Sequence, residues 1–211
     1  MATRCLLLML FLFHAICGMA SAQDVTSIPC TVTASRLRVD IVFDGPPIPK
    51  KLEASAMEEV TQIWAAYGVD VHKSNPSDVL PDGAIRLAVI FADHPDQHTA
   101  AGALGSIVFL DDRPVPAIVM YPRTIAALVS TVTLMGTNDK VWPKALYDLV
   151  MGRVLGRALA HEIGHFLLRL RGHSRKGLMR PRHQVPDLVG ANRSSFVLSA
   201  DEVARLVSVT P

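Results

Sequence analysis

The chain has 211 residues, of which 50% are hydrophobic, 19% charged and 6% aromatic, and its formal net charge at pH 7 is +2. This length and composition are typical of one globular domain. Charges of both signs are mixed along the chain and no basic block stands out, which argues against nucleic acid as a partner.

Residues 1–22 have the pattern of a secretory signal peptide. Arg4 precedes an apolar stretch over residues 5–16, and the segment ends in small residues of the A-x-A type. The apolar stretch is shorter than the roughly 20 residues that a bilayer crossing needs, so we expect cleavage and no stable membrane anchor. The mature chain would then be a single domain over residues 23–211, secreted or periplasmic.

The expected cleavage also determines how many cysteines the mature chain contains. It removes Cys5 and Cys17 and leaves Cys30 as the single cysteine of the mature chain. An internal disulfide is therefore excluded, although an oxidising compartment would permit one. Stability must come from packing, with help from any metal ion that the chain binds.

The first half of the mature chain predicts strands around one helix. Residues 36–43 alternate between apolar and polar side chains, as a half-buried strand does. Helical spacing follows over residues 52–67 until Gly68 stops it. Four more strands are predicted, the last two joined by a turn at residues 111–114. These strands cover residues 69–72, 84–92, 106–110 and 117–121.

The second half predicts one long helix and a short terminal one. Residues 124–135 are apolar and fit either a helix or a buried loop. A helical pattern then runs from about Lys144 to Leu170. Gly152 and Gly156, one turn apart on it, indicate a close packing contact with the sheet. Residues 199–202 form a capping box that opens a terminal helix ending near Val207.

The long helix contains the motif His161-Glu162-Ile163-Gly164-His165. Two histidines four residues apart lie on one helical face, so both imidazoles can bind one cation. Glu162 is rotated by about 100° and can reach a metal-bound water without being a ligand. Zinc suits two such nitrogens plus a third protein ligand, with one position left for water, whose pKa then falls toward about 7.

The third ligand is expected just beyond the helix, where the chain turns back beneath the metal. His173 is the first candidate, because it follows Gly172, a residue type that readily takes the left-handed conformation that ends helices. The alternatives are side chains further along the chain. They are Asp201, Glu202, His183 and Asp187.

These residues resemble the metzincin clan of zinc peptidases, whose pattern is HExxHxxGxxH followed by a methionine-containing turn under the metal. Here the HExxH motif is followed by His173-Ser174 and by Gly177-Leu178-Met179. A group of small exported bacterial proteins with HExGH, an HS pair and a GLM turn is more similar still. Two departures stand out: His173 lies eight residues after His165 instead of six, and Leu168 stands at the position of the clan's glycine.

The resemblance implies an α+β fold of metzincin type. Such a fold has a mixed sheet of about five strands, a helix after the first strand, a long metal-binding helix and a short C-terminal helix. The resemblance also implies an exported zinc metallopeptidase that acts on peptide or protein substrates. One Zn²⁺ would be held by His161, His165 and His173, and Glu162 would activate the zinc-bound water. The strand at residues 106–110 would form the rim of the cleft and pair with an extended substrate.

Two other functions are compatible with the same residues: a non-catalytic exported binding module stabilised by zinc, and a zinc hydrolase of a non-peptide substrate. Cys30 is either a small packed hydrophobe or a thiolate that caps the zinc and keeps the enzyme latent. His94 and His98 are also four apart, but Pro95 between them favours a surface loop. Tyr121 either donates to a developing oxyanion or packs in the core.

Overall fold

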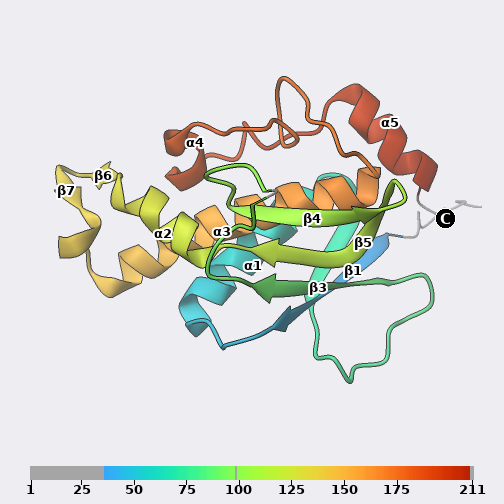
Figure 1. The fold of residues 1–211 in the computed structure, drawn as a ribbon, viewed down its shortest axis with the longest axis horizontal. Helices are drawn as coiled ribbons and strands as arrows, with labels where there is room; N and C mark the ends of the chain where they lie inside the picture. The colour runs from blue at the N-terminus through green and yellow to red at the C-terminus, as the bar shows by residue number, and fades with distance from the viewer. Residues whose placement is uncertain (1–35, 98, 210–211) are drawn as a thin grey trace, which may run out of the picture. The chain divides into compact units, whose positions relative to one another are not determined.

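The computed structural model describes residues 36–97 and 99–209, which are built around one mixed sheet (Figure 1). The predicted signal peptide, Cys30 and His98 lie outside the described residues. The strand order is β2-β1-β3-β5-β4, with β4 antiparallel to β5 and the other pairs parallel. The strands are β1 (Leu37–Asp44), β2 (Val69–Lys73), β3 (Ile85–Phe91), β4 (Gly105–Leu110) and β5 (Arg113–Met120).

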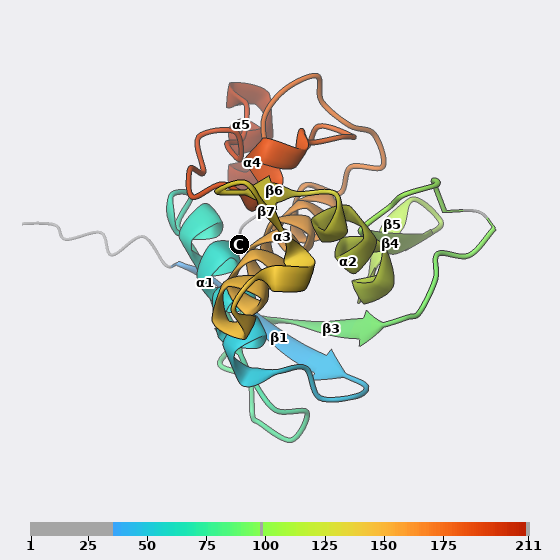
Figure 2. The ribbon, with the colours of Figure 1, turned by 90° about the vertical axis from the view of Figure 1, so that its left-hand side faces the viewer.

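Helices α1 (Lys50–Ala65) and α3 (Lys144–Leu168) pack against one face of this sheet, and the other helices pack around α3 (Figure 2). The other helices are α2 (Pro122–Ser130), α4 (Val185–Val189) and α5 (Ala200–Val209). A two-stranded hairpin of β6 (Thr133–Leu134) and β7 (Thr137–Asn138), followed by a 3-10 turn (Asp139–Val141), connects α2 to α3. No helix in the described part of the chain combines the length and the apolar character that a membrane crossing requires.

The predicted strands and the helix after the first strand are confirmed, with one correction in β5. The turn before β5 contains only Asp111 and Asp112, both at positive φ (46° and 61°), as a two-residue hairpin turn requires. Arg113 already belongs to the strand. The sequence predicted a longer turn because Pro114 and Pro116 disfavour strands, yet β3 pairs only with the second half of β5 and leaves this stretch paired on one side.

The segment that the sequence left open, residues 124–135, is mostly helical. It forms most of α2, whose buried residues Ile125 and Val129 lie one turn apart and so share one helix face. The helix ends at Ser130, and the segment continues into β6. The hairpin and α4 were not predicted, because elements of two to five residues are too short to show a hydrophobic period.

Gly152 and Gly156 bring α3 against α1, and not against the sheet as predicted. A Cβ on Gly152 would lie 2.5 Å from the Leu52 carbonyl oxygen, and one on Gly156 would collide with the Ala56 carbonyl oxygen. Only glycine permits this approach of two helix backbones. The sequence indicated a close contact, but both the sheet and α1 offered an apolar surface for it.

Candidate metal centre

The last turns of α3 place His161 and His165 on one face, as their spacing predicts. Their Nε2 atoms lie 3.1 Å apart, and their ring centroids lie 4.7 Å apart with the ring planes at 82°. The helix is fixed by the core, since Leu159 and Ile163, on either side of His161, are fully or almost fully buried. Both imidazoles are therefore mounted on a rigid element.

Helix α3 ends at Leu168, two residues before the predicted end. Arg169 takes the left-handed conformation (φ 50°, ψ 44°), and its N–H donates to carbonyls of the last helical turn. The prediction that Gly172 ends the helix is wrong, because an arginine supplies the left-handed residue and is held by those hydrogen bonds. The early turn also places the Leu170 carbonyl oxygen 2.5 Å from Nδ1 of His165.

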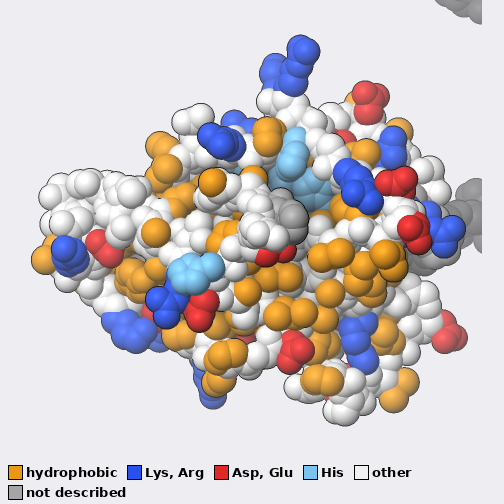
Figure 3. Space-filling view, viewed as in Figure 1, with side chains coloured by type: hydrophobic (Ala, Val, Ile, Leu, Met, Phe, Trp, Pro, Cys, Tyr) orange, Lys and Arg blue, Asp and Glu red, His pale blue; other side chains and the backbone are white. Residues whose placement is uncertain are grey.

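The loop after α3 returns His173 to the two helical histidines. Its ring stacks on that of His161, with centroids 5.3 Å apart, and lies perpendicular to that of His165, with centroids 4.9 Å apart. One nitrogen from each ring lies within 4.8 Å of the other two. In Figure 3, histidine side chains reach the surface above β4. The longer spacing before His173 is accommodated in the loop, and three imidazoles converge as the sequence predicts.

Two backbone carbonyls decide which nitrogens face the centre. Nδ1 of His161 lies 2.7 Å from the Leu178 carbonyl oxygen, and Nδ1 of His165 has the same relation to Leu170. A carbonyl oxygen only accepts, so both Nδ1 atoms carry protons and donate. In the neutral rings Nε2 is then unprotonated, and two lone pairs meet at 3.1 Å with no hydrogen between them. This contact is repulsive unless a cation lies between the rings, so the donor set fits a metal ion.

Burial keeps the imidazoles neutral, which metal binding requires. Loss of hydration lowers the pKa of His161 to about 3, and the neighbouring His165 adds to this shift. Loss of hydration also lowers the pKa values of His165 and His173. At neutral pH all three rings therefore offer a lone pair.

Glu162 is buried beside the first residue of β4. Its Cγ lies 3.1 Å from the position that a Cβ on Gly105 would take, so glycine at this strand position leaves room for the carboxyl side chain. Burial raises the pKa of Glu162 to about 8, and a nearby cation would favour its ionised form. Its carboxyl group can therefore exchange a proton near neutral pH, as a general base must.

The turn that contains Met179 packs against the metal-binding helix. The Met179 side chain is fully buried, and its sulfur occupies the place where a Cβ on Gly164 would stand. Gly177 has φ of 76°, and a Cβ there would collide with the Val197 carbonyl oxygen. Glycine is thus required both in the HEIGH motif and in the turn, and the sequence did not reveal that these two glycines serve one packing arrangement.

None of the alternative third ligands joins the group of three histidines. Glu202 accepts hydrogen bonds from Ser174 Oγ and, at 2.7 Å, from the Ser199 N–H, which confirms the predicted capping box. Asp187 pairs with Arg180. His183 is hydrogen-bonded through both ring nitrogens, and Asp201 is exposed on α5. Within residues 36–97 and 99–209, the three converging histidines are the one group of His, Cys, Asp and Glu that gathers ligand atoms in this way.

Two further candidates from the sequence have plain structural roles. Tyr121 is 3% exposed, and its hydroxyl lies 2.8 Å from Ser106 Oγ, which supports packing and not oxyanion binding. His94 is exposed in the loop between β3 and β4, as expected of a surface residue. His98, four residues further on, is not among the described residues.

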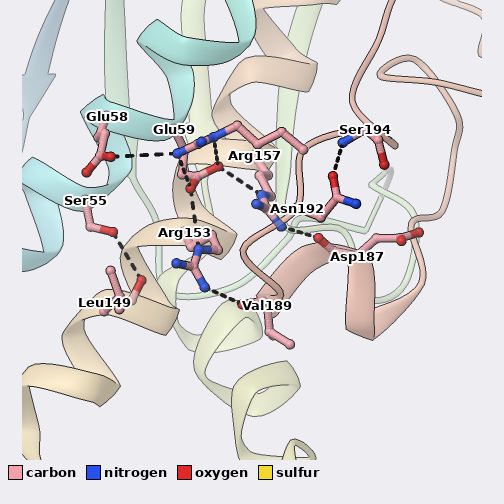
Figure 4. Close-up of polar contacts among 11 residues, drawn as sticks. Ser55, Glu58, Glu59, Leu149, Arg153, Arg157, Asp187, Val189, Asn192 and Ser194 are labelled. Atoms are coloured by element: carbon pink, nitrogen blue, oxygen red, sulfur yellow. Dashed lines mark hydrogen bonds and ion pairs between the residues drawn. The ribbon is translucent and has the colours of Figure 1, made fainter.

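A buried ion cluster lies one turn before His161 and was missed in the sequence (Figure 4). Glu59 of α1 accepts from Arg157 at 3.1 Å and from Arg193 at 2.9 Å, and Arg153 lies 3.4 Å away. The cluster joins α1, α3 and the segment after α4. Two arginines four residues apart in the otherwise apolar stretch 149–160 of α3 were the available signal, since buried arginines need a partner.

Similarity to known proteins is found among solved structures and not in sequence. No protein family model matches the chain, and no curated protein is similar to it in sequence. Among solved structures, an archaemetzincin from Methanopyrus kandleri is similar over 85% of this chain and 98% of that one, with 14% identity and a TM-score of 0.49. The predicted α+β class is confirmed by the five-stranded mixed sheet, the helix after β1 and the long helix that carries two of the three histidines.

Proposed function

We propose that the protein is a zinc-dependent peptidase that acts outside the cytoplasm. One observation carries the proposal: three neutral imidazoles converge beside a buried carboxyl group, and two of them are fixed so that their unprotonated Nε2 atoms meet. His161, His165 and His173 would hold one Zn²⁺, because zinc in catalytic sites takes three protein ligands and keeps one position open.

Zinc in such a site makes water more acidic and polarises a peptide carbonyl. Glu162 would take a proton from the attacking water and pass it to the leaving amine. Its raised pKa suits both halves of this cycle, because the carboxyl group has to hold the proton between the two steps. β4 is the edge of the sheet beside Glu162, so a peptide that adds to this edge as a further strand would run past the carboxyl group.

The geometry favours a catalytic centre over a purely structural one. Structural zinc sites are closed by four protein ligands. The described residues supply three; Asp187 is paired with Arg180, and Cys30 lies outside the described residues. A zinc-stabilised binding module is therefore the less supported function.

Export is part of the proposal and rests on the sequence of residues 1–22. It is tested by expressing the full chain in a bacterium and sequencing the amino terminus of the protein in each cell fraction. A chain that begins at Gln23 outside the cytoplasm supports export. An intact chain that stays in the cytoplasm contradicts it.

The activity is tested by digesting a peptide library with purified protein, with zinc supplied and with a chelator. We expect cleavage with zinc, none with the chelator, and recovery when zinc is returned. A protein that retains stoichiometric zinc and cuts no peptide would favour the binding module or a zinc hydrolase of a non-peptide substrate. A protein that retains no zinc would contradict the proposal.

A further inference from the structure

His183 lies close to the candidate metal centre, with its ring centroid 6.2 Å from that of His161, yet it is not free to be a ligand. The Nε–H of Arg180 donates to Nδ1 of His183 at 3.1 Å. Because Nδ1 accepts, the proton of the neutral ring is on Nε2, which lies 3.2 Å from the Leu178 carbonyl oxygen. His183 is therefore a hydrogen-bond donor to the backbone.

The Leu178 carbonyl is shared by two imidazoles. It accepts from Nδ1 of His161 at 2.7 Å and from Nε2 of His183 at 3.2 Å, and the two ring planes are perpendicular. A carbonyl oxygen has two lone pairs, and both are used here. Two donors from different directions fix the orientation of this carbonyl, and the carbonyl in turn fixes the plane of the His161 ring.

The His183 ring is itself held on its face. Phe196, which is 2% exposed, stacks on it with centroids 4.6 Å apart and planes at 17°. The guanidinium of Arg157 lies 4.8 Å from the centre of the Phe196 ring, and Arg157 is paired with Glu59 of α1. A continuous set of contacts thus runs from α1 through the buried ion cluster and two stacked rings to His161.

We propose that His183 is a positioning residue for the metal centre. By donating to the Leu178 carbonyl, it holds the His161 ring at the angle at which Nε2 faces the other two imidazoles. The inference rests on the proposed zinc site and assigns to that site a residue outside the ligands. Outer hydrogen-bond partners of metal ligands typically change metal affinity by about 10- to 100-fold when they are removed.

Two substitutions distinguish the effect of the hydrogen-bond donor of His183 from the effect of its aromatic ring. His183→Phe keeps an aromatic ring for Phe196 and removes the donor. His183→Gln removes the ring and places an amide N–H at about the reach of Nε2. His72→Phe is the matched control, because His72 is an exposed imidazole on β2, at the opposite edge of the sheet from β4.

Each variant of the mature chain is titrated with zinc in competition with a chromophoric chelator, and the visible spectrum of the Co²⁺-loaded protein is recorded. We expect His183→Phe to weaken zinc affinity by about 10- to 100-fold and to change the Co²⁺ ligand-field bands. His183→Gln should recover most of that affinity, and His72→Phe should behave as wild type.

Wild-type affinity and an unchanged Co²⁺ spectrum in His183→Phe would overturn the proposal. An equal loss in His183→Gln would also overturn it, because the donor would then not matter. If circular dichroism shows that His183→Phe does not fold, Arg180→Met replaces it. That change lets the His183 proton move to Nδ1, so zinc affinity should fall, and full affinity would be the overturning result. A wild-type chain that takes up no zinc contradicts the proposed function itself, which separates the two failures.

Discussion

The sulfur of Met179 occupies the space beside Gly164 that a side chain would otherwise fill. The fourth residue of the HEIGH motif and a turn 15 positions later therefore form one packing arrangement. The glycine lets the turn approach α3, and the turn supplies the Leu178 carbonyl that orients His161. Packing and ligand orientation are coupled at this point.

Gly164→Ala should destabilise the metal-free protein. The added methyl group would collide with the buried Met179 sulfur, and overpacking of this kind costs about 1–3 kcal/mol, against about 1 kcal/mol gained in helix propensity. Urea unfolding measures the difference. Gly172→Ala is the control, since a Cβ at Gly172 meets nothing within 4 Å. Equal stability of the two variants would show that the turn adapts freely.

Glu162→Gln should leave zinc content near one ion per chain and reduce kcat by about 10²- to 10⁴-fold, the usual contribution of a general base. The amide has the shape of the carboxyl group but cannot take up a proton. Metal analysis and the rate of cleavage of one library-derived peptide give the two quantities. A variant that keeps wild-type kcat would remove Glu162 from the mechanism.

His173→Ala should weaken zinc binding by more than the roughly 100-fold that marks the upper range for outer hydrogen-bond partners. His173 converges with the two helical histidines, whereas Asp201 is exposed on α5 and Glu202 is occupied by Ser174. Competition with a chelator measures the affinity, with Asp201→Asn as the control. A larger loss in the control would make the terminal helix the source of the third ligand.

The pH dependence of stability should differ between wild type and Glu162→Gln in the metal-free state. The folded pKa of Glu162 is raised to about 8, against about 4.5 in the unfolded chain, so unfolding releases a proton between these values. The contribution of this group is fully present below pH 4.5 and is lost as the pH rises to 8. The stability of Glu162→Gln relative to wild type should therefore increase across this window, as measured by urea midpoints at several pH values. A constant difference would mean that Glu162 ionises normally.

Glu59→Gln should destabilise the fold by about 3–5 kcal/mol, because it leaves the buried guanidinium of Arg157 without its counter-charge. Glu58→Gln is a matched control on the same helix. Its side chain is 66% exposed and lies 3.8 Å from Arg193, so its loss should change stability by less than about 1 kcal/mol. Thermal or urea unfolding compares the two. If both substitutions destabilised the fold equally, the stabilising contact would be the one that Glu58 and Glu59 share, the contact with Arg193.

Local geometry explains what could be predicted from the sequence. Two histidines four residues apart must share a helix face, and alternating or continuous apolar runs give strands, so α3 and the five-stranded sheet follow from neighbouring residues. The capping box of α5 is equally local, since Ser199 and Glu202 lie within one turn.

The rest depends on contacts between residues far apart in sequence. Glu59 and Arg157 are 98 positions apart, and no pattern within either helix names the other residue. The role of His183 depends on the path of the chain after α3, which brings its ring against Phe196 and its Nε2 to the Leu178 carbonyl. The end of α3 was mispredicted for a different reason: the left-handed position is taken by Arg169, and non-glycine residues rarely adopt that conformation.

The loop over residues 169–180 contains His173 and both carbonyls, Leu170 and Leu178, that orient the helical imidazoles. An ion bound by His161, His165 and His173 would therefore link the loop to α3. This link would matter in a chain whose expected mature form has no disulfide. Loss of the ion would remove this link, leave the loop held by its packing and by the two carbonyl hydrogen bonds, and make it easier for proteases to cut. The lifetime of the protein in its surroundings would then follow the local supply of zinc.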